Sequence, residues 1–168
     1  MTAEAAATLV EAVVEDARWD GVGIGALAET AASAALSAAG LDPARCELSL
    51  LACDDARIAV LNGSFRGKPA ATNVLSWPAF EGGPPAPGPA RDGEEPLFLG
   101  DLAIAYDTCA AEAAAAGVTL ADHATHLVVH GVLHLLGHDH EDDGEAEVME
   151  ALETKVLASL GIDDPYSR

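Results

Sequence analysis

Apolar residues recur along the chain with the period of two that is typical of strands, and this pattern predicts a small sheet. Leu48, Leu50 and Ala52 lie on one parity of residues 46–53, which is typical of a half-buried strand. A second apolar run, over residues 97–105, is interrupted by Gly100-Asp101, so the strand predicted there is expected to line something polar. Short apolar or β-branched runs predict further strands at residues 9–15 and 73–76. The first of these is expected at a sheet edge, with a helix as the alternative.

Helical spacing and helix-ending signals predict about five helices. Gly40 and Gly117 each close an alanine-rich segment, and Thr119 followed by Asp122 resembles a capping box at the start of a helix. The predicted helices cover residues 24–39, about 55–62, 106–116, a segment that begins after 119, and a segment from about 145 to 160. The last helix carries an apolar stripe made of Val148, Met149, Leu152, Val156 and Leu160.

Strands and helices in this order predict an α+β fold, with a single small mixed β-sheet of about four strands packed with about five helices. The length suits one domain over residues 1–168 with its own hydrophobic core. Residues 81–93 are rich in Pro and Gly, and we interpret them as a flexible surface loop, not as a domain boundary.

The charge is strongly acidic, with a formal net value of −20, and this disfavours a broad nucleic-acid surface. The charge is unevenly distributed, because four of the eight basic residues lie within positions 57–91, while positions 139–164 hold ten acids and one lysine. The three cysteines form no CxxC pair and fit a reducing compartment. No membrane-spanning run or secretory signal is recognisable, so a cytoplasmic location is expected.

All six histidines lie between His123 and His140, and three of them have the spacing of a metal site. His130 and His134 are four residues apart, so they share one helix face. Gly137 can end the helix in a left-handed conformation, after which His140 can return to the same point. Three imidazoles around one ion with an open fourth position are typical of a catalytic zinc site. The sequence therefore predicts one Zn²⁺ per chain, held by His130, His134 and His140.

The remaining polar residues near this motif have less defined roles. His138 is expected at the rim, because it follows Gly137 too closely for a ligand, and His123 is expected to be exposed. His126 could support a ligand, line a cleft or be a satisfied helix histidine. Asp101 and Asp139 could each orient a ligand histidine or only accept backbone hydrogen bonds. Asn73 and Ser76 are either polar cleft residues or turn residues.

Gly131 stands where zinc proteases with this spacing place the glutamate that acts as general base. Its structural interpretation is a close approach by another backbone, and its functional interpretation is that proteolysis by that mechanism lacks its base.

Several segments together resemble the YbeY family of bacterial endoribonucleases. They are the His130–His140 motif with Asp139, Phe65-Arg66, residues 72–78, Leu99-Gly100-Asp101, and the acidic helical tail with Glu145, Glu147, Met149 and Leu152. The resemblance implies zinc binding by the three histidines, a requirement for Arg66, and a role in ribosomal RNA maturation, including the 3′ end of 16S rRNA, and in ribosome quality control. The chain departs from the family pattern at His138, a position that is often aromatic, and in the expanded loop 81–93.

The leading hypothesis is therefore a zinc-dependent endoribonuclease acting on single-stranded RNA. Arg66 and His134 are the predicted catalytic residues, and Arg66 and Lys68 the predicted substrate-binding residues, since a guanidinium matches phosphate bidentately. The acidity is reconciled if RNA contact is confined to the basic window and a ribosomal protein or translation-associated factor delivers the substrate. The alternatives are a metallohydrolase of the zinc protease type, which Gly131 disfavours, and a non-catalytic zinc-binding ribosome assembly factor.

Overall fold

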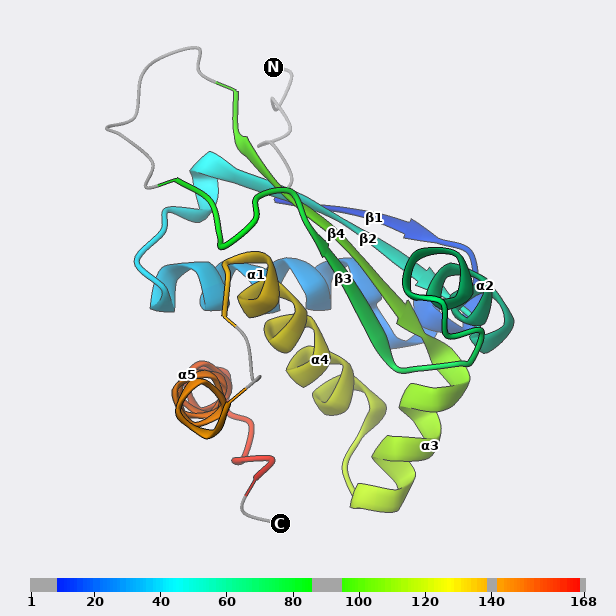
Figure 1. Cartoon of the computed structure of the whole chain (residues 1–168). Helices are drawn as coiled ribbons and strands as arrows, with labels where there is room; N and C mark the ends of the chain where they lie inside the picture. Colours follow the sequence, from blue (N-terminus) through cyan, green and yellow to red (C-terminus); the bar gives the residue numbers. More distant parts are fainter. Residues whose placement is uncertain (1–8, 86–94, 139–141, 167–168) are drawn as a thin grey trace, which may run out of the picture.

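The computed structural model describes residues 9–85, 95–138 and 142–166, and its centre is a four-stranded mixed sheet (Figure 1). β1, β2 and β4 are parallel, and β3 is antiparallel to β4. The strand order is β1-β2-β4-β3, so the predicted edge position of the first strand is confirmed and the alternative helix there is wrong. The strands cover Val10–Val14 (β1), Cys46–Cys53 (β2), Val74–Pro78 (β3) and Leu97–Ala105 (β4).

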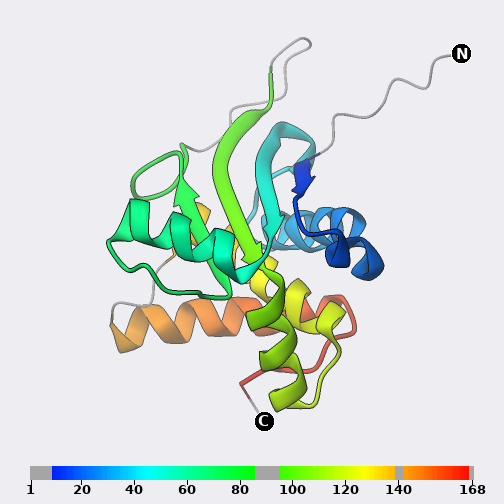
Figure 2. The ribbon, with the colours of Figure 1, turned by 90° about the vertical axis from the view of Figure 1, so that its right-hand side faces the viewer.

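The described residues contain five α-helices, as predicted, arranged in layers around the sheet (Figure 2). α1 and α4 cover one face of the sheet, and α2 lies on the opposite face. α5 packs against α1 and α4 on the side away from the sheet. The α-helices are Ile24–Ala38 (α1), Asp55–Arg66 (α2), Tyr106–Ala116 (α3), Leu120–Leu135 (α4) and Asp143–Ser159 (α5), and short 3₁₀ helices cover Ala17–Val22 and Pro43–Arg45.

Strand β4 is buried from both sides, which explains its almost continuous apolar run. Leu102 and Ile104 pack into the main core, which the sheet shares with α1, α4 and α5. Ala103 and Ala105 point the other way and form a smaller core with Ile58 of α2. A central strand covered on both faces needs apolar residues at both parities.

Helix α4, which carries most of the histidines, is fixed at both ends by local hydrogen bonds. The Thr119 side chain accepts a hydrogen bond from the backbone N–H of Asp122 at 3.1 Å, which confirms the predicted start. Gly137 has a φ of 96°, and the N–H of His138 donates to the carbonyl of Leu133 at 3.0 Å, as in a Schellman motif. The predicted helix end at Gly137 is therefore confirmed.

Gly131 is buried in the middle of α4, directly over β4. A Cβ built there would lie 2.8 Å from Cδ2 of Leu102. The predicted close neighbour is therefore present, but it is a leucine side chain and not a backbone, so that part of the interpretation was wrong.

The three cysteines are buried and form no disulfide. No helix in the described part of the chain combines the length and the apolar character that a membrane crossing requires.

Candidate functional site

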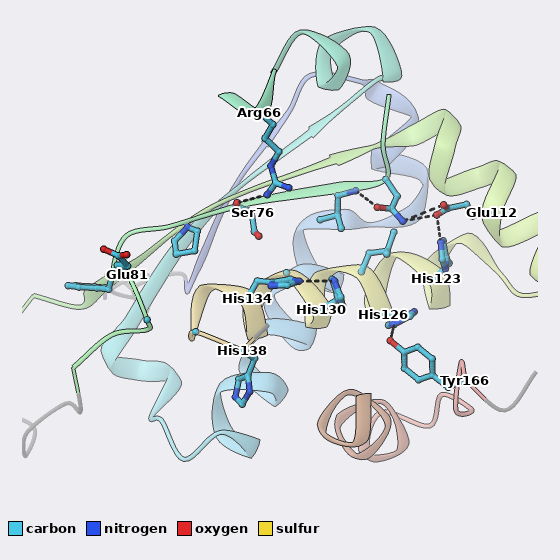
Figure 3. Close-up of a pocket in the computed structure, with 18 residues that line it drawn as sticks. Arg66, Ser76, Glu81, Glu112, His123, His126, His130, His134, His138 and Tyr166 are labelled. Atoms are coloured by element: carbon cyan, nitrogen blue, oxygen red, sulfur yellow. Dashed lines mark hydrogen bonds and ion pairs between the residues drawn. The ribbon is translucent and has the colours of Figure 1, made fainter. Parts of the chain in front are cut away.

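A cavity of about 990 Å³ lies between α4 and β3, and a row of histidines forms its α4 side (Figure 3). His123, His126, His130 and His134 follow one another along this side. Residues three or four positions apart share one helix face, which explains the row. The other walls come from the last residue of α2, from β3 and the loop after it, from α3, and from the tail after α5.

The imidazoles of His130 and His134 meet at one point. Their Nε2 atoms lie 3.0 Å apart. Two nitrogen ligands of one tetrahedral zinc ion, each about 2.0–2.1 Å from the metal, would lie about 3.3 Å apart. The two rings therefore fit a shared ion. The predicted third ligand, His140, lies outside the described residues, and His138 is half-buried and lines one end of the cavity.

Behind the first of these histidines lies a fully buried carboxylate, Glu153 of α5. One of its oxygens is hydrogen-bonded to Nδ1 of His130. The other accepts a hydrogen bond from the hydroxyl of Tyr166 and lies 3.3 Å from Nε2 of His126. A single carboxylate of α5 thus joins three cavity-lining side chains, two from α4 and one from the tail.

Hydrogen bonds keep this carboxylate ionised in spite of its burial. Burial alone would raise the pKa of Glu153, but the hydrogen bonds to His126, His130 and Tyr166 outweigh it and lower the pKa to about 2. Sequence reasoning missed Glu153, because it lies within the acidic segment 139–164, where nothing distinguished it from the other carboxylates. Its position four residues after Met149 was the available signal, since that places it on the buried stripe of α5.

At the other end of the cavity, His123 is paired with Glu112 of α3. Nε2 of His123 lies 2.9 Å from a carboxylate oxygen of Glu112, and the side chain of Asn73 donates to the same carboxylate at 3.0 Å. His123 is only 12% exposed, so its predicted exposure was wrong. His123 is partly buried because α3 packs beside the first turn of α4 and places Glu112 next to it.

Arg66, the last residue of α2, lies across the cavity from His134 (Figure 3). Its guanidinium donates to the backbone carbonyl of Ser76 on β3 at 3.4 Å. Among the described residues that line the cavity it is the only Lys or Arg, whereas Glu81 and Glu112 contribute carboxylates. The described lining of the cavity therefore presents one permanent positive charge opposite the histidine pair.

Two glycine segments meet at the end of the cavity near His134. A Cβ at Gly137 would lie 2.5 Å from the carbonyl oxygen of Gly82, and a Cβ at Gly83 would lie 2.4 Å from the carbonyl oxygen of Leu136. The loop after β3 and the turn after α4 thus touch backbone to backbone. This contact fixes the turn from which the chain continues toward the third predicted ligand.

Comparison with known proteins shows the family to which the chain belongs. A family model described as Endoribonuclease YbeY matches residues 14–161. The protein of that name from Dinoroseobacter shibae is 57% identical over 162 residues, covering 94% of this chain and 90% of the relative. The one from Ruegeria pomeroyi is 55% identical over 163 residues, covering 94% and 98%. The chain belongs to the YbeY family.

The YbeY-family fold is also similar to the solution structure of a protein from Thermotoga maritima. The TM-score is 0.56 at 18% sequence identity, with 90% of this chain and 91% of the other covered. This likeness concerns the fold alone.

In this YbeY-family chain, Asp101 lies on the face of the sheet opposite to that of α4, which carries His130 and His134. Its side chain accepts a hydrogen bond from Ser49 of β2, opposite which it lies in the sheet. Asp101 is on the same parity as Ala103 and Ala105, which face α2. The predicted alternative that Asp101 orients a ligand histidine is therefore wrong for His130 and His134, and stays untested for His140.

The other predicted polar residues are placed as follows. Asn73 and Ser76 both line the cavity, which favours the cleft interpretation over the turn interpretation. Lys68 is exposed after α2 and is not among the described lining residues, so its phosphate contact stays a prediction. Asp139 lies outside the described residues. His126 lines the cavity, which confirms its predicted cleft position, and its Nε2 lies 3.3 Å from Glu153, whereas its support of a ligand stays a prediction.

Proposed function

We propose that this protein is a zinc-dependent endoribonuclease that cleaves single-stranded RNA during ribosomal RNA maturation. Its membership of the YbeY family supports endoribonuclease activity. The observation that supports the metal-dependent mechanism is the placement of the His130 and His134 nitrogens, 3.0 Å apart, opposite the guanidinium of Arg66 in one cavity.

His130, His134 and His140 would hold the ion. When bound, zinc supplies a Lewis acid and lowers the pKa of a water molecule in its open position. Arg66 would bind the scissile phosphate with its planar fork and neutralise the charge that develops as the phosphodiester is attacked. Its hydrogen bond to Ser76 holds the guanidinium against the β3 wall, facing the histidines.

The acidity of the chain sets a limit on how it meets RNA. The described cavity offers one arginine, and single-stranded RNA loses affinity with a slope of about −0.7 in log–log salt plots for each neutralised phosphate. We therefore expect the isolated protein to bind RNA weakly, with a slope near that value. A ribosomal protein or translation-associated factor would then deliver the substrate, in the reducing cytoplasm that suits the three thiols. Tight binding with a steep slope would contradict this delivery model.

The decisive experiment pairs zinc analysis with cleavage of ribosomal RNA. Arg66→Ala should keep its zinc and lose about 10²–10³-fold in rate, as expected for the loss of one transition-state donor. Arg57→Ala is the matched control, because Arg57 lies on the same helix, is exposed, and does not line the cavity. Equal rates for both variants would contradict the role of Arg66.

Two alternative functions predict different outcomes. A zinc protease would degrade unfolded casein, which we do not expect because Gly131 occupies the position of the general base. A non-catalytic assembly factor would keep its activity in cells after folded Arg66→Ala or His134→Ala substitution, whereas a nuclease would lose it.

A further inference from the structure

We propose that Glu153 is a positioning residue that holds the proton of His130 on Nδ1, so that the Nε2 lone pair faces the cavity. The inference rests on the proposed metal site for its purpose, but the proton position can be measured without any metal. It concerns a residue that touches neither substrate nor ion and acts through the histidine in front of it.

The first step is the chemistry of the hydrogen bond. An ionised carboxylate can only accept, so Nδ1 of His130 must carry the hydrogen in its contact with Glu153. A neutral imidazole has one N–H, and therefore Nε2 of His130 is left with its lone pair. That nitrogen is the one that lies 3.0 Å from Nε2 of His134. The hydrogen bond to Glu153 thus selects the tautomer of His130 that a metal ligand requires.

The second step is that the carboxylate itself is held in place. Its other oxygen accepts from the Tyr166 hydroxyl and lies 3.3 Å from His126. The tail that carries Tyr166 is anchored in turn, because Asp164 accepts from the N–H of Tyr166 at 2.8 Å and from the hydroxyl of Thr154 at 3.2 Å. Glu153 therefore cannot rotate away from His130 without breaking these contacts.

The third step separates positioning from simple packing. Replacing Glu153 alone by an apolar side chain leaves the polar atoms of His126, His130 and Tyr166 without their acceptor, so Glu153→Met is expected to be less stable. A loss of stability by itself would fit a purely structural Glu153 as well as a positioning one. A positioning Glu153 predicts a change in the tautomer of His130 and in metal affinity, even in a folded variant.

The first test is ¹⁵N NMR of the histidine side chains in the metal-free, full-length chain. We expect wild-type His130 to carry its proton on Nδ1, and Glu153→Met to lose that preference. Glu147→Gln is the matched control, since it removes a glutamate charge from an exposed position on the same helix and should leave His130 unchanged. Retention of the Nδ1 proton in Glu153→Met, or its absence in the wild type, would overturn the proposal.

The second test is zinc affinity, measured by competition with a chromophoric chelator. Loss of such a supporting partner costs about 10–100-fold in metal affinity, so Glu153→Met should bind zinc that much more weakly than Glu147→Gln. Glu153→Gln should fall between them, because its amide offers one oxygen where the carboxylate offers two. If Glu153→Met does not fold, Glu153→Gln decides alone, and wild-type affinity there refutes the idea. If the wild type binds no zinc, the proposed metal site fails while the NMR result still decides on Glu153.

Discussion

The two ends of the cavity use the same pair of residue types in opposite orientations. At the end near His134, which we call the metal end because it contains the proposed zinc site, Glu153 is fully buried behind His130 and is hydrogen-bonded to its Nδ1, so that Nε2 faces the cavity. At the far end, Glu112 is 42% exposed and takes the Nε2 of His123. The first arrangement presents a ligand nitrogen, and the second uses that nitrogen for a carboxylate. The ring nitrogen that binds the carboxylate therefore decides whether a histidine in this row has its Nε2 available to the cavity.

Alanine substitution at each end tests this difference most directly. His130→Ala should lose its zinc and more than about 10²-fold in RNA cleavage, exceeding the loss typical of an outer partner. His123→Ala should keep one zinc per chain, measured by elemental analysis. Zinc loss from both variants, or from neither, would break the distinction between the two ends.

A backbone comparison extends the test to the turn beside the metal end. Gly137→Ala should destabilise the fold by about 3 kcal/mol, because left-handed strain of about 1–2 kcal/mol adds to a clash with the carbonyl of Gly82. Gly117→Ala, at the end of α3, has a φ of 72° but no neighbour within 4 Å, so it should cost about 1 kcal/mol. Urea unfolding of both variants measures the difference, and equal values would contradict a close backbone contact.

The shape of the cation facing the metal end can be separated from its charge. Arg66→Lys keeps the positive charge but loses the planar fork, so cleavage should fall by about 10-fold with zinc content unchanged. This loss should lie between those of Arg57→Ala and Arg66→Ala in the same rate assay. A rate equal to the wild type would show that charge alone suffices.

The smallest expected effect comes from the tail. Tyr166→Phe removes one hydrogen bond from Glu153, worth about 1 kcal/mol, which corresponds to about 5-fold in zinc affinity. Chelator competition measures it against the wild type. Asn73→Ala, which removes a donor to Glu112 at the far end, is the control and should leave zinc affinity unchanged. A reversed order would place the metal at the wrong end.

The fold could be predicted from the sequence largely because local signals and tertiary structure agree. The capping pair at Thr119 and the left-handed Gly137 set the two ends of α4, and helical spacing alone brings His130 and His134 together. Alternation in β4 also predicts the direction of Asp101, because its neighbour Leu102 points into the core shared with α4 and Asp101 must point to the opposite face.

The partners of the histidines could not be predicted in the same way. Glu153 is 23 residues from His130 in the chain, and Glu112 is 11 residues from His123, so their pairing depends on how α3 and α5 pack against α4. A glutamate within an acidic run carries no local sign that it is buried. Only its place on the apolar stripe of α5 distinguishes Glu153 from its solvated neighbours.

The contact between the Gly82-Gly83 and Leu136-Gly137 segments also limits how this region can evolve. A methyl group added at Gly83 or Gly137 would strike a main-chain oxygen and not a side chain. A second-site suppressor that trims a neighbouring side chain therefore offers no relief, since there is none to trim. Mutational repair at this junction requires either reversion or a shift of the whole loop, so the closeness of the two backbones constrains Gly83 and Gly137 together.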